Sequence, residues 1–289
     1  MTTDTWSGFK DIDTRMPLSL QEDVWVNDDY NDSTPGWGYN HFNTIQEGVN
    51  AVNSSGTIGN VYVYNGTYNE SVIIKKPVKI RGLRGNDGYG NDSYPPVVYD
   101  PSVAFIVIGN NASGTNISHF YITGGVVAGI LVLASESVEI SYNNIYLNRR
   151  GLYIMSSPSC HITHNNVVSN TRMGISLENS NHCTFNRNYI ANNNGSGIDL
   201  AFSDDANIAY NYIGLNGNFT IWIGRGVNRN TIYHNDIIDK TPFKKFWNPR
   251  FYDSKNFWND NYWSDRAPNS IWYFVRGFYV IGFGKKIIG

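Results

Sequence analysis

Short alternations of apolar and polar residues recur along the middle of the chain at a fixed spacing. Successive segments over residues 129–240 repeat with a period of 22 to 24 residues, and each has three alternating stretches separated by turn residues. Alternation over a few residues is typical of half-buried β-strands, and a period of this size is typical of repeat architectures. The pattern therefore predicts a solenoid in which each segment forms one coil of three short strands.

The apolar positions fall into columns when the segments are aligned. If each segment is one coil, every column becomes a continuous stack of buried side chains. Two columns come from the first stretch of each segment and two from the later stretches: Ile130, Leu152, Ile175, Ile198 and Ile221; Val132, Ile154, Leu177, Leu200 and Ile223; Ile140, Ile162, Phe185, Ile208 and Ile232; Ile145, Val167, Ile190, Ile213 and Ile237.

Asparagine and serine recur with the same period, at the turns. Side chains one coil apart, about 4.8 Å, can pass an amide hydrogen bond from coil to coil while also satisfying turn backbone groups. We therefore expect internal asparagine ladders rather than exposed amides. The columns are Asn143, Asn165, Asn188, Asn211 and Asn235; Asn148, Asn170, Asn193 and Asn216; and Ser135, Ser157, Ser180 and Ser203.

The remaining segments predict how the solenoid begins and ends. Residues 1–23 form an N-terminal extension, residues 24–57 an opening strand and a capping helix, residues 58–241 the β-helix, and residues 242–289 an aromatic-rich C-terminal cap. In the segment 42–52 apolar residues share one helical face, with Asn43 and Gln46 as the expected capping pair. Such a helix would cover the unpaired strand edges of the first coil. Residues 84–96 are rich in Gly, Asn and Asp and predict a protruding loop.

Composition excludes several classes of function. Charged residues make up 16% of the 289 residues and the net charge is −2, so a nucleic-acid or anionic-membrane partner is not expected. No stretch is long and apolar enough for a membrane span. The 2 cysteines, Cys160 and Cys183, occupy equivalent positions in adjacent coils and are expected to be buried thiols rather than a disulfide.

The repeat resembles the right-handed parallel β-helix of the pectin-lyase-like superfamily. More narrowly, it is similar to the NosD-like or CASH group of carbohydrate-binding proteins and sugar hydrolases. Segment 59–82 resembles the first coil of that group, with Gly-Thr-Tyr at 66–68, Glu70 and Ile-Arg-Gly at 80–82, and segment 256–265 resembles its closing coil. The resemblance implies an all-β, single-stranded right-handed parallel β-helix that is extracellular or on the cell surface, as nine Asn-x-Ser/Thr sequons weakly support.

The outward positions of the first strand in each coil supply the candidate binding site. Tyr153 and Trp222 are rings able to stack on sugars, and the remaining candidates carry charge: Arg150, Arg172, Glu178 and Asp199. Arginine can hold a uronate carboxylate with two hydrogen bonds. An exposed carboxylate or arginine on a solenoid is, however, more often a solvating group. A second exposed series precedes the first asparagine ladder: Tyr142, His164, Arg187, Tyr210 and His234.

Two classes of function follow. The first, which the sequence favours, is a non-catalytic glycan-binding or assembly module at the cell surface. The second is a polysaccharide lyase or uronate C5-epimerase, whose chemistry needs a cation on the carboxylate together with an acid and a base. In that case Tyr153, Arg172, Glu178, Asp199 and His164 are the candidate catalytic residues. An enzyme predicts a cleft walled by loops over Tyr153 to Trp222, whereas a binding module predicts a flat face.

No resident metal or cofactor is expected. The chain has 6 His, 4 Met and 2 Cys without a cluster of them, so copper chemistry suggested by the NosD name is not carried over. Asp204 and Asp205 would bind Ca²⁺ only with further oxygen ligands. The aromatic tail is expected to pack on the solenoid itself, and self-association through it is the alternative.

Overall fold

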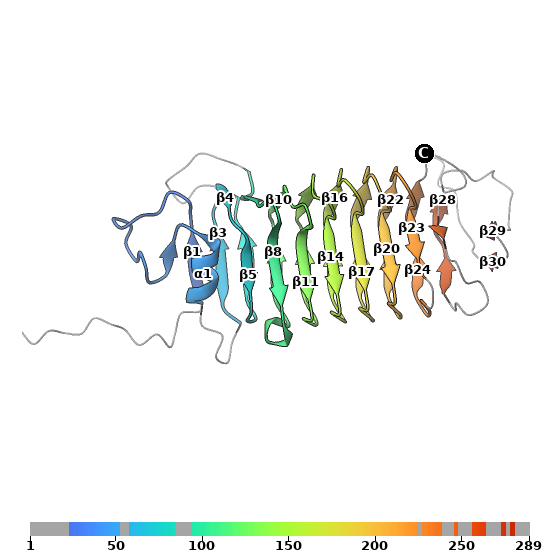
Figure 1. Cartoon of the computed structure of the whole chain (residues 1–289), viewed down its shortest axis with the longest axis horizontal. Coiled ribbons are helices and arrows are strands. Elements are labelled where there is room, and N and C mark those ends of the chain that lie inside the picture. Colours follow the sequence, from blue (N-terminus) through green and yellow to red (C-terminus); the bar gives the residue numbers. More distant parts are fainter. Residues whose placement is uncertain are drawn as a thin grey trace, which may run out of the picture.

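The computed structural model describes residues 23–52, 58–84, 94–224, 227–238, 246–247, 256–263, 273–275 and 278–280. Within these residues, parallel strands stack coil upon coil along one long axis, from blue at the N-terminal end to red at the C-terminal end (Figure 1). The fold is the all-β parallel β-solenoid that the repeat predicts.

Three parallel sheets form the sides of the solenoid in the described part of the chain. The first contains, in spatial order, β2 (His41–Phe42), β1 (Asp23–Val26), β3 (Asn60–Val63), β6 (Lys79–Gly82), β9 (Asn116–Ser118), β12 (Glu139–Ser141), β15 (His161–Thr163), β18 (Thr184–Asn186), β21 (Asn207–Ala209), β24 (Thr231–Tyr233) and β27 (Phe257–Asn259).

The second sheet contains β28 (Tyr262–Trp263), β25 (Asp236–Ile238), β22 (Tyr212–Gly214), β19 (Tyr189–Ala191), β16 (Asn166–Val168), β13 (Asn144–Tyr146), β10 (Tyr121–Thr123), β7 (Val97–Tyr99) and β4 (Thr67–Asn69). The third contains β26 (Phe246–Trp247), β23 (Ile221–Ile223), β20 (Ile198–Ala201), β17 (Ile175–Glu178), β14 (Leu152–Met155), β11 (Ala128–Leu133), β8 (Val103–Ile108) and β5 (Val72–Ile74). An antiparallel pair, β29 (Tyr273–Val275) and β30 (Phe278–Val280), and a 3-10 helix at Asn110–Ala112 complete the elements.

The predicted apolar columns form the core between the three sheets. All of their members are at most 1% exposed, and each pairs in register with its equivalent in the next coil. In the earlier coils Phe105 and Phe120 pack with ring centroids 5.2 Å apart. Burial of these columns fixes which way each strand faces, so alternate residues must point outward.

The predicted asparagine ladder is present and lies at the turns between the first and second sheets. The side-chain amide of Asn165 donates to the carbonyl of Ile140 at 2.7 Å and to Oδ1 of Asn188 at 3.1 Å. The same Oδ1 of Asn188 accepts the backbone N–H of Asn165 at 2.9 Å. Equivalent bonds run from Asn143 to Asn261, so each rung satisfies buried backbone groups that would otherwise lack partners.

Segment 256–263 continues this ladder, in agreement with its expected place as a closing coil. Its strands β27 and β28 pair with β24 and β25, and Asn261 accepts from the backbone and side chain of Asn235. The predicted boundaries at 23, 57 and 241 adjoin or fall within undescribed residues, so they remain predictions. Residues 1–22, most of loop 84–96 and most of the tail lie outside the described residues.

A helix, α1 (Ile45–Ala51), lies over the first coil as expected (Figure 1). Its cap differs from the predicted Asn43 and Gln46. Thr44 accepts from the backbone N–H of Glu47 at 3.2 Å and donates to its carboxylate at 2.9 Å. The helix therefore begins one residue later than the sequence pattern indicated, because the Thr44 hydroxyl caps the N–H of Glu47 and is itself held by the Glu47 carboxylate.

Gln46 instead binds the edge of the solenoid. Its amide pairs with the backbone N–H and carbonyl of Ile73 at 2.6 and 3.2 Å, in place of a neighbouring strand. Glu70 accepts from the N–H groups of Ile45 and Gln46 at 2.7 and 2.9 Å. Lys76 donates to the last helix carbonyls, including that of Val52. These contacts give Glu70 a structural role and close the exposed strand edge.

The ladder predicts that inward-facing asparagines contribute much more to the free energy of unfolding than outward-facing ones. Asn188→Ala should lower the free energy of unfolding by about 2–4 kcal/mol, because it leaves buried groups of two coils unpaired. Asn166→Ala, which removes one outer-face bond to Asn144 (2.9 Å), should cost about 1 kcal/mol or less. Urea unfolding of the two variants measures this, and equal costs would contradict the ladder's role.

Candidate functional site

The outward residues of the third sheet form one continuous face over β14, β17, β20 and β23. Tyr153 pairs in register with Ser176, Ser176 with Asp199, and Asp199 with Trp222. All four are half-buried, between fully buried neighbours on their strands. The predicted facing of this strand is therefore confirmed, and Asp199 and Trp222 lie side by side.

Tyr153 is the centre of a polar cluster on this face. Its hydroxyl donates to Oε2 of Glu178 at 2.7 Å and lies 3.5 Å from the sulfur of Met155. The guanidinium of Arg150 lies over its ring, 4.6 Å from the centroid, a favourable cation–π geometry. Burial, the hydrogen bond to Glu178 and the charge of Glu178 raise the pKa of Tyr153, so the hydroxyl keeps its proton at neutral pH.

Asp199 has the most strongly perturbed carboxyl group of this face. Burial raises its pKa to about 6, with Glu178 adding to the rise while Arg150 and Arg172 oppose it. Both arginines and both carboxylates thus act on one another electrostatically. Such a group changes its charge near pH 6 rather than near pH 4, which is typical of functional sites.

Arg150 and Arg172 occupy equivalent positions in adjacent coils, each two residues after a paired asparagine, Asn148 or Asn170. The backbone N–H of Arg172 donates to the carbonyl of Arg149 at 2.8 Å, the bond expected when Arg172 stacks on Arg150, and the one extra residue of the turn 169–174 follows Arg172. Arg172 is exposed, whereas Arg150 is half-buried and its Nε has no acceptor among the described residues. An unsatisfied buried donor favours an additional ligand or a bound water.

His164 lies elsewhere on the solenoid. It follows β15 at the corner between the first and second sheets, and its ring stacks on Tyr142 at 4.7 Å. Tyr142 also stacks on His119 at 5.1 Å, and Tyr210 on His234 at 5.1 Å. The exposed series predicted from sequence is thus a column in which rings stack on their neighbours and the guanidinium of Arg187 lies over Tyr210. Its members have left-handed backbone, with φ from 52° to 58° for Tyr142, His164, Arg187, Tyr210 and His234.

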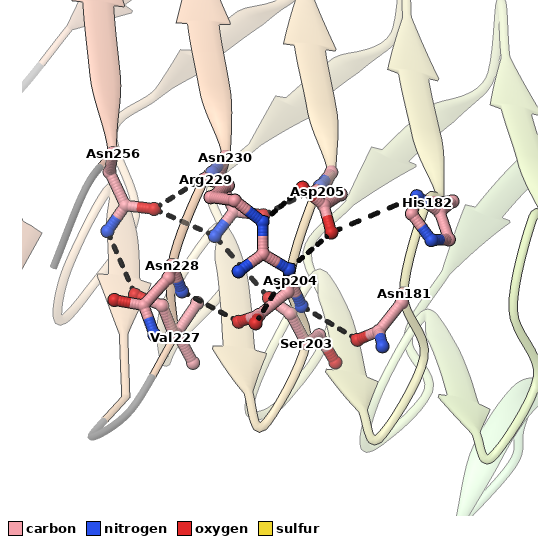
Figure 2. A network of polar contacts seen from close by, with 11 residues as sticks. Asn181, His182, Ser203, Asp204, Asp205, Val227, Asn228, Arg229, Asn230 and Asn256 are labelled. Atoms are coloured by element: carbon pink, nitrogen blue, oxygen red, sulfur yellow. Dashed lines mark hydrogen bonds and ion pairs between the residues drawn. The ribbon is translucent and has the colours of Figure 1, made fainter.

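Asp204 and Asp205 take part in an ion-pair network (Figure 2). Arg229 donates to both carboxylate oxygens of Asp205 at 2.8 and 2.7 Å and approaches Asp204 at 3.3 Å. His182 lies 4.0 Å from Asp205 on the other side. The hydrogen bonds from Arg229 lower the pKa of Asp205. A Ca²⁺ ion at this pair would have to displace a guanidinium, so the pair serves to join adjacent coils.

Cys160 and Cys183 are both free and fully buried. The thiol of Cys160 lies 3.3 Å from the carbonyl of Ser157. Contact with Cys160, followed by burial, raises the pKa of Cys183. Within the described ranges no three residues among His, Cys, Asp and Glu lie together as a metal site. No helix there is long and apolar enough to cross a membrane.

Sequence reasoning missed the aromatic pairs of the other two sheets. Trp25 stacks on Tyr62 with centroids 4.7 Å apart on the first sheet, and Tyr189 stacks on Tyr212 at 4.6 Å on the second. The second pair is visible in the repeat, because its members occupy equivalent outward positions in adjacent coils. The first pair could not be found from the repeat, because it depends on β1 lying next to β3 in the sheet.

The raised pKa of Asp199 predicts a stabilising substitution. A folded-state pKa above the unfolded value contributes stability below about pH 4, and this is lost as pH rises through about 6. Asp199→Asn should therefore stabilise the protein by about 1–3 kcal/mol at pH 8 and change little at pH 4. Chemical denaturation at both pH values measures this, and an equal effect at both would contradict the burial of this charge.

The fold is similar to those of several solved proteins. DFA-IIIase from Arthrobacter chlorophenolicus A6, without its lid, matches 84% of this chain and 72% of its own, with a TM-score of 0.60 and 15% identity. The Dettilon tailspike protein matches 83% of this chain with a TM-score of 0.57 and 15% identity. A tailspike protein of the Acinetobacter baumannii bacteriophage Fri1, a capsular polysaccharide depolymerase, matches 83% with a TM-score of 0.53 and 11% identity.

This chain spans 49% and 53% of the two tailspikes, and at such identities the likeness shows the fold alone. No curated protein sequence matches the chain. The family of the periplasmic copper-binding protein NosD matches residues 52–269, which include every coil of the solenoid after the capping helix. With three sheets of in-register parallel strands over the same residues, the chain belongs to the NosD family of pectin-lyase-like β-helix proteins.

Proposed function

We propose that this protein is an exported or cell-surface β-helix protein that binds an acidic polysaccharide through the outer face of β14, β17, β20 and β23. The observation that carries the proposal is the cluster around Tyr153, whose hydroxyl is bound to Glu178 and whose ring lies beneath the guanidinium of Arg150. Further along the same face, Asp199, a carboxyl of raised pKa, lies beside Trp222. The sugar-acting fold relatives support the choice of ligand class.

Each residue of this face suits one part of an acidic sugar. The exposed guanidinium of Arg172 can hold a carboxylate, for which its planar fork is well shaped. The half-buried ring of Trp222 offers an apolar surface for a sugar ring. Tyr153 and Glu178, already positioned by their mutual bond, offer groups for sugar hydroxyls. The strand spacing places these groups along the solenoid axis, so an extended glycan would run across the strands.

Binding is favoured over turnover by the form of the face. The connections that leave β14 and β17, residues 156–160 and 179–183, are short turns and supply no loop that walls a cleft. Tyr153 has a raised pKa and its hydroxyl already donates to Glu178, so it is poorly suited to remove a proton. Short turns beside preformed polar contacts favour recognition over turnover.

A lyase or uronate C5-epimerase is the second candidate, and the pKa of Asp199 favours it. Near pH 6 this carboxyl exists in both protonation states and lies within the field of Arg150 and Arg172. In such a reaction an arginine would neutralise the uronate carboxylate, Asp199 or Glu178 would accept the C5 proton, and Tyr153 would act as the acid. His164, at another corner, would have no part.

Copper is named in the family's description, but the donor residues of this chain do not fit a copper site. In the column at the corner between the first and second sheets, Tyr142 separates His119 from His164. Both thiols are buried against backbone carbonyls. No metal step is therefore part of the proposal. The periplasmic assignment of the family supports a location outside the cytoplasm.

Loss of the Trp222 ring should weaken glycan binding. We expect Trp222→Ala to reduce affinity for a uronate-containing polysaccharide by about tenfold or more, as for a buried aromatic contact. Tyr99→Ala, which removes a 43% exposed ring from the second sheet, is the matched control and should change nothing. Isothermal titration calorimetry with a panel of neutral and acidic glycans measures both. The same loss in both variants, or binding unaffected by Trp222→Ala, would contradict the assignment of the face.

The charge of Asp199 should make this binding depend on pH. Protonation of Asp199 below about pH 6 removes a negative charge beside Arg172, so affinity for an acidic glycan should fall as pH rises from 5 to 7. Asp199→Asn should bind with the low-pH affinity throughout this range. A neutral glycan serves as the control, because its affinity should not follow the same curve.

Turnover is tested on the same polysaccharides by following absorbance of unsaturated uronates and new reducing ends. The binding proposal predicts retention on immobilised glycan without either signal. Unsaturated products that disappear in Tyr153→Phe would instead establish the lyase.

A further inference from the structure

Arg81, on the first sheet, and Arg84, just beyond its strand, are both near enough to His119 for their charges to act on it. Arg81 of β6 pairs in register with Ser118 of β9, and His119 follows directly in a left-handed turn with φ of 66°. Gly82 allows this approach, since a Cβ there would collide with the carbonyl oxygen of His119. Arg84 lies two residues further on, and both arginines are exposed.

These cations have no anionic partner in the described part of the chain. Ion pairs there join only His182 and Arg229 to Asp204 and Asp205. Burial, followed by the charges of Arg81 and Arg84, lowers the pKa of His119, and no carboxylate opposes this shift. Its Nδ1 is buried and has no hydrogen-bond partner among the residues that the structure describes. Among the described residues, no anionic group therefore offsets the positive charge at this corner.

Aromatic rings and a hydroxyl group border the two arginines. Tyr62 is the register partner of Arg81 on the side away from Ser118, and its ring stacks on Trp25 with centroids 4.7 Å apart at 28°. On the other side, His119 stacks on Tyr142. A fixed half-buried aromatic surface beside paired guanidinium groups suits a ring that carries a negative charge.

We propose that Arg81 and Arg84 form a second binding site, which holds the carboxylate or sulfate group of an acidic sugar whose ring lies against Tyr62. Guanidinium groups bind both oxyanions through paired charge-assisted hydrogen bonds. The site belongs to the first sheet, so a test of it is independent of a test of the glycan face on the third sheet. Together the two faces would give one solenoid two points of attachment.

His119 provides a built-in reporter of occupancy. An anion held between Arg81 and Arg84 cancels the charges that lower the pKa of His119, so this pKa should rise towards its ordinary range. The experiment is an NMR pH titration of the histidine rings of the full chain, with glucuronate, inorganic sulfate, glucose or sodium chloride added at matched ionic strength. His182, beside Asp205, is the internal control.

Glucuronate and sulfate should raise the pKa of His119 in a saturable way, whereas glucose and chloride should not. The double variant Arg81→Gln/Arg84→Gln should show a raised pKa without ligand and at least about tenfold weaker binding. Arg187→Gln, a matched exposed arginine in the same column as Tyr142, should behave as the parent protein. If glucuronate binds more tightly than sulfate, the site recognises an acidic sugar. If the two bind equally, the site recognises a free oxyanion. No saturable shift, or the same shift in the double variant, would overturn the proposal.

Discussion

The buried amide ladder is the interaction on which the rest of this structure depends. A parallel solenoid must turn the chain twice or more in every coil, and each turn leaves backbone donors and acceptors inside the molecule. Asn143, Asn165, Asn188, Asn211 and Asn235 satisfy them with the side chain of the next rung. Each amide is bound on several sides, so a one-residue slip would leave buried groups unpaired in two coils.

The ladder also sets what the outer faces can do. Because it fixes the left-handed residue before each rung, Tyr142, His164 and Tyr210 project from the corner and pack on their neighbours. Because it fixes strand register, Tyr153 meets Glu178 from the next coil, and Asp199 meets Trp222. A polar cluster that spans several coils is thereby preorganised, since the core holds each strand in place.

Electrostatics distinguishes the candidate site from an ordinary solvated surface. The ion pairs of Asp204 and Asp205 with Arg229 lower the pKa of Asp205, as is usual for a structural pair. On the third sheet the outcome is the reverse, since two nearby arginines do not outweigh the burial of Asp199. A carboxyl kept at a cost to stability favours a functional role, because stability alone would select its loss.

Much of this could be predicted from the sequence because the repeat itself is informative. Columns such as Ile130 to Ile221 predict burial, and alternation then places Tyr153, Asp199 and Trp222 outward. The contact of Arg150 with Tyr153 could not be predicted, because it depends on how a side chain at the turn lies against the strand that follows.

The neighbours of Arg81 could not be predicted either, because they come from segments outside the regular repeat. Similarly, the true cap of α1 depended on Thr44 and Glu47, one residue away from an equally plausible pair. Periodicity fixes register, whereas local turn geometry decides which charged side chains meet.

The central claim is that a ladder-fixed outer face of the third sheet recognises an acidic glycan. A crystal structure of the protein soaked with a saturating uronate oligosaccharide tests it most directly. The account predicts a sugar ring against Trp222, with its carboxylate at Arg172 and hydroxyl groups near Tyr153 and Glu178. An oligosaccharide bound only on other faces, or no bound sugar on an unobstructed third sheet, would contradict it.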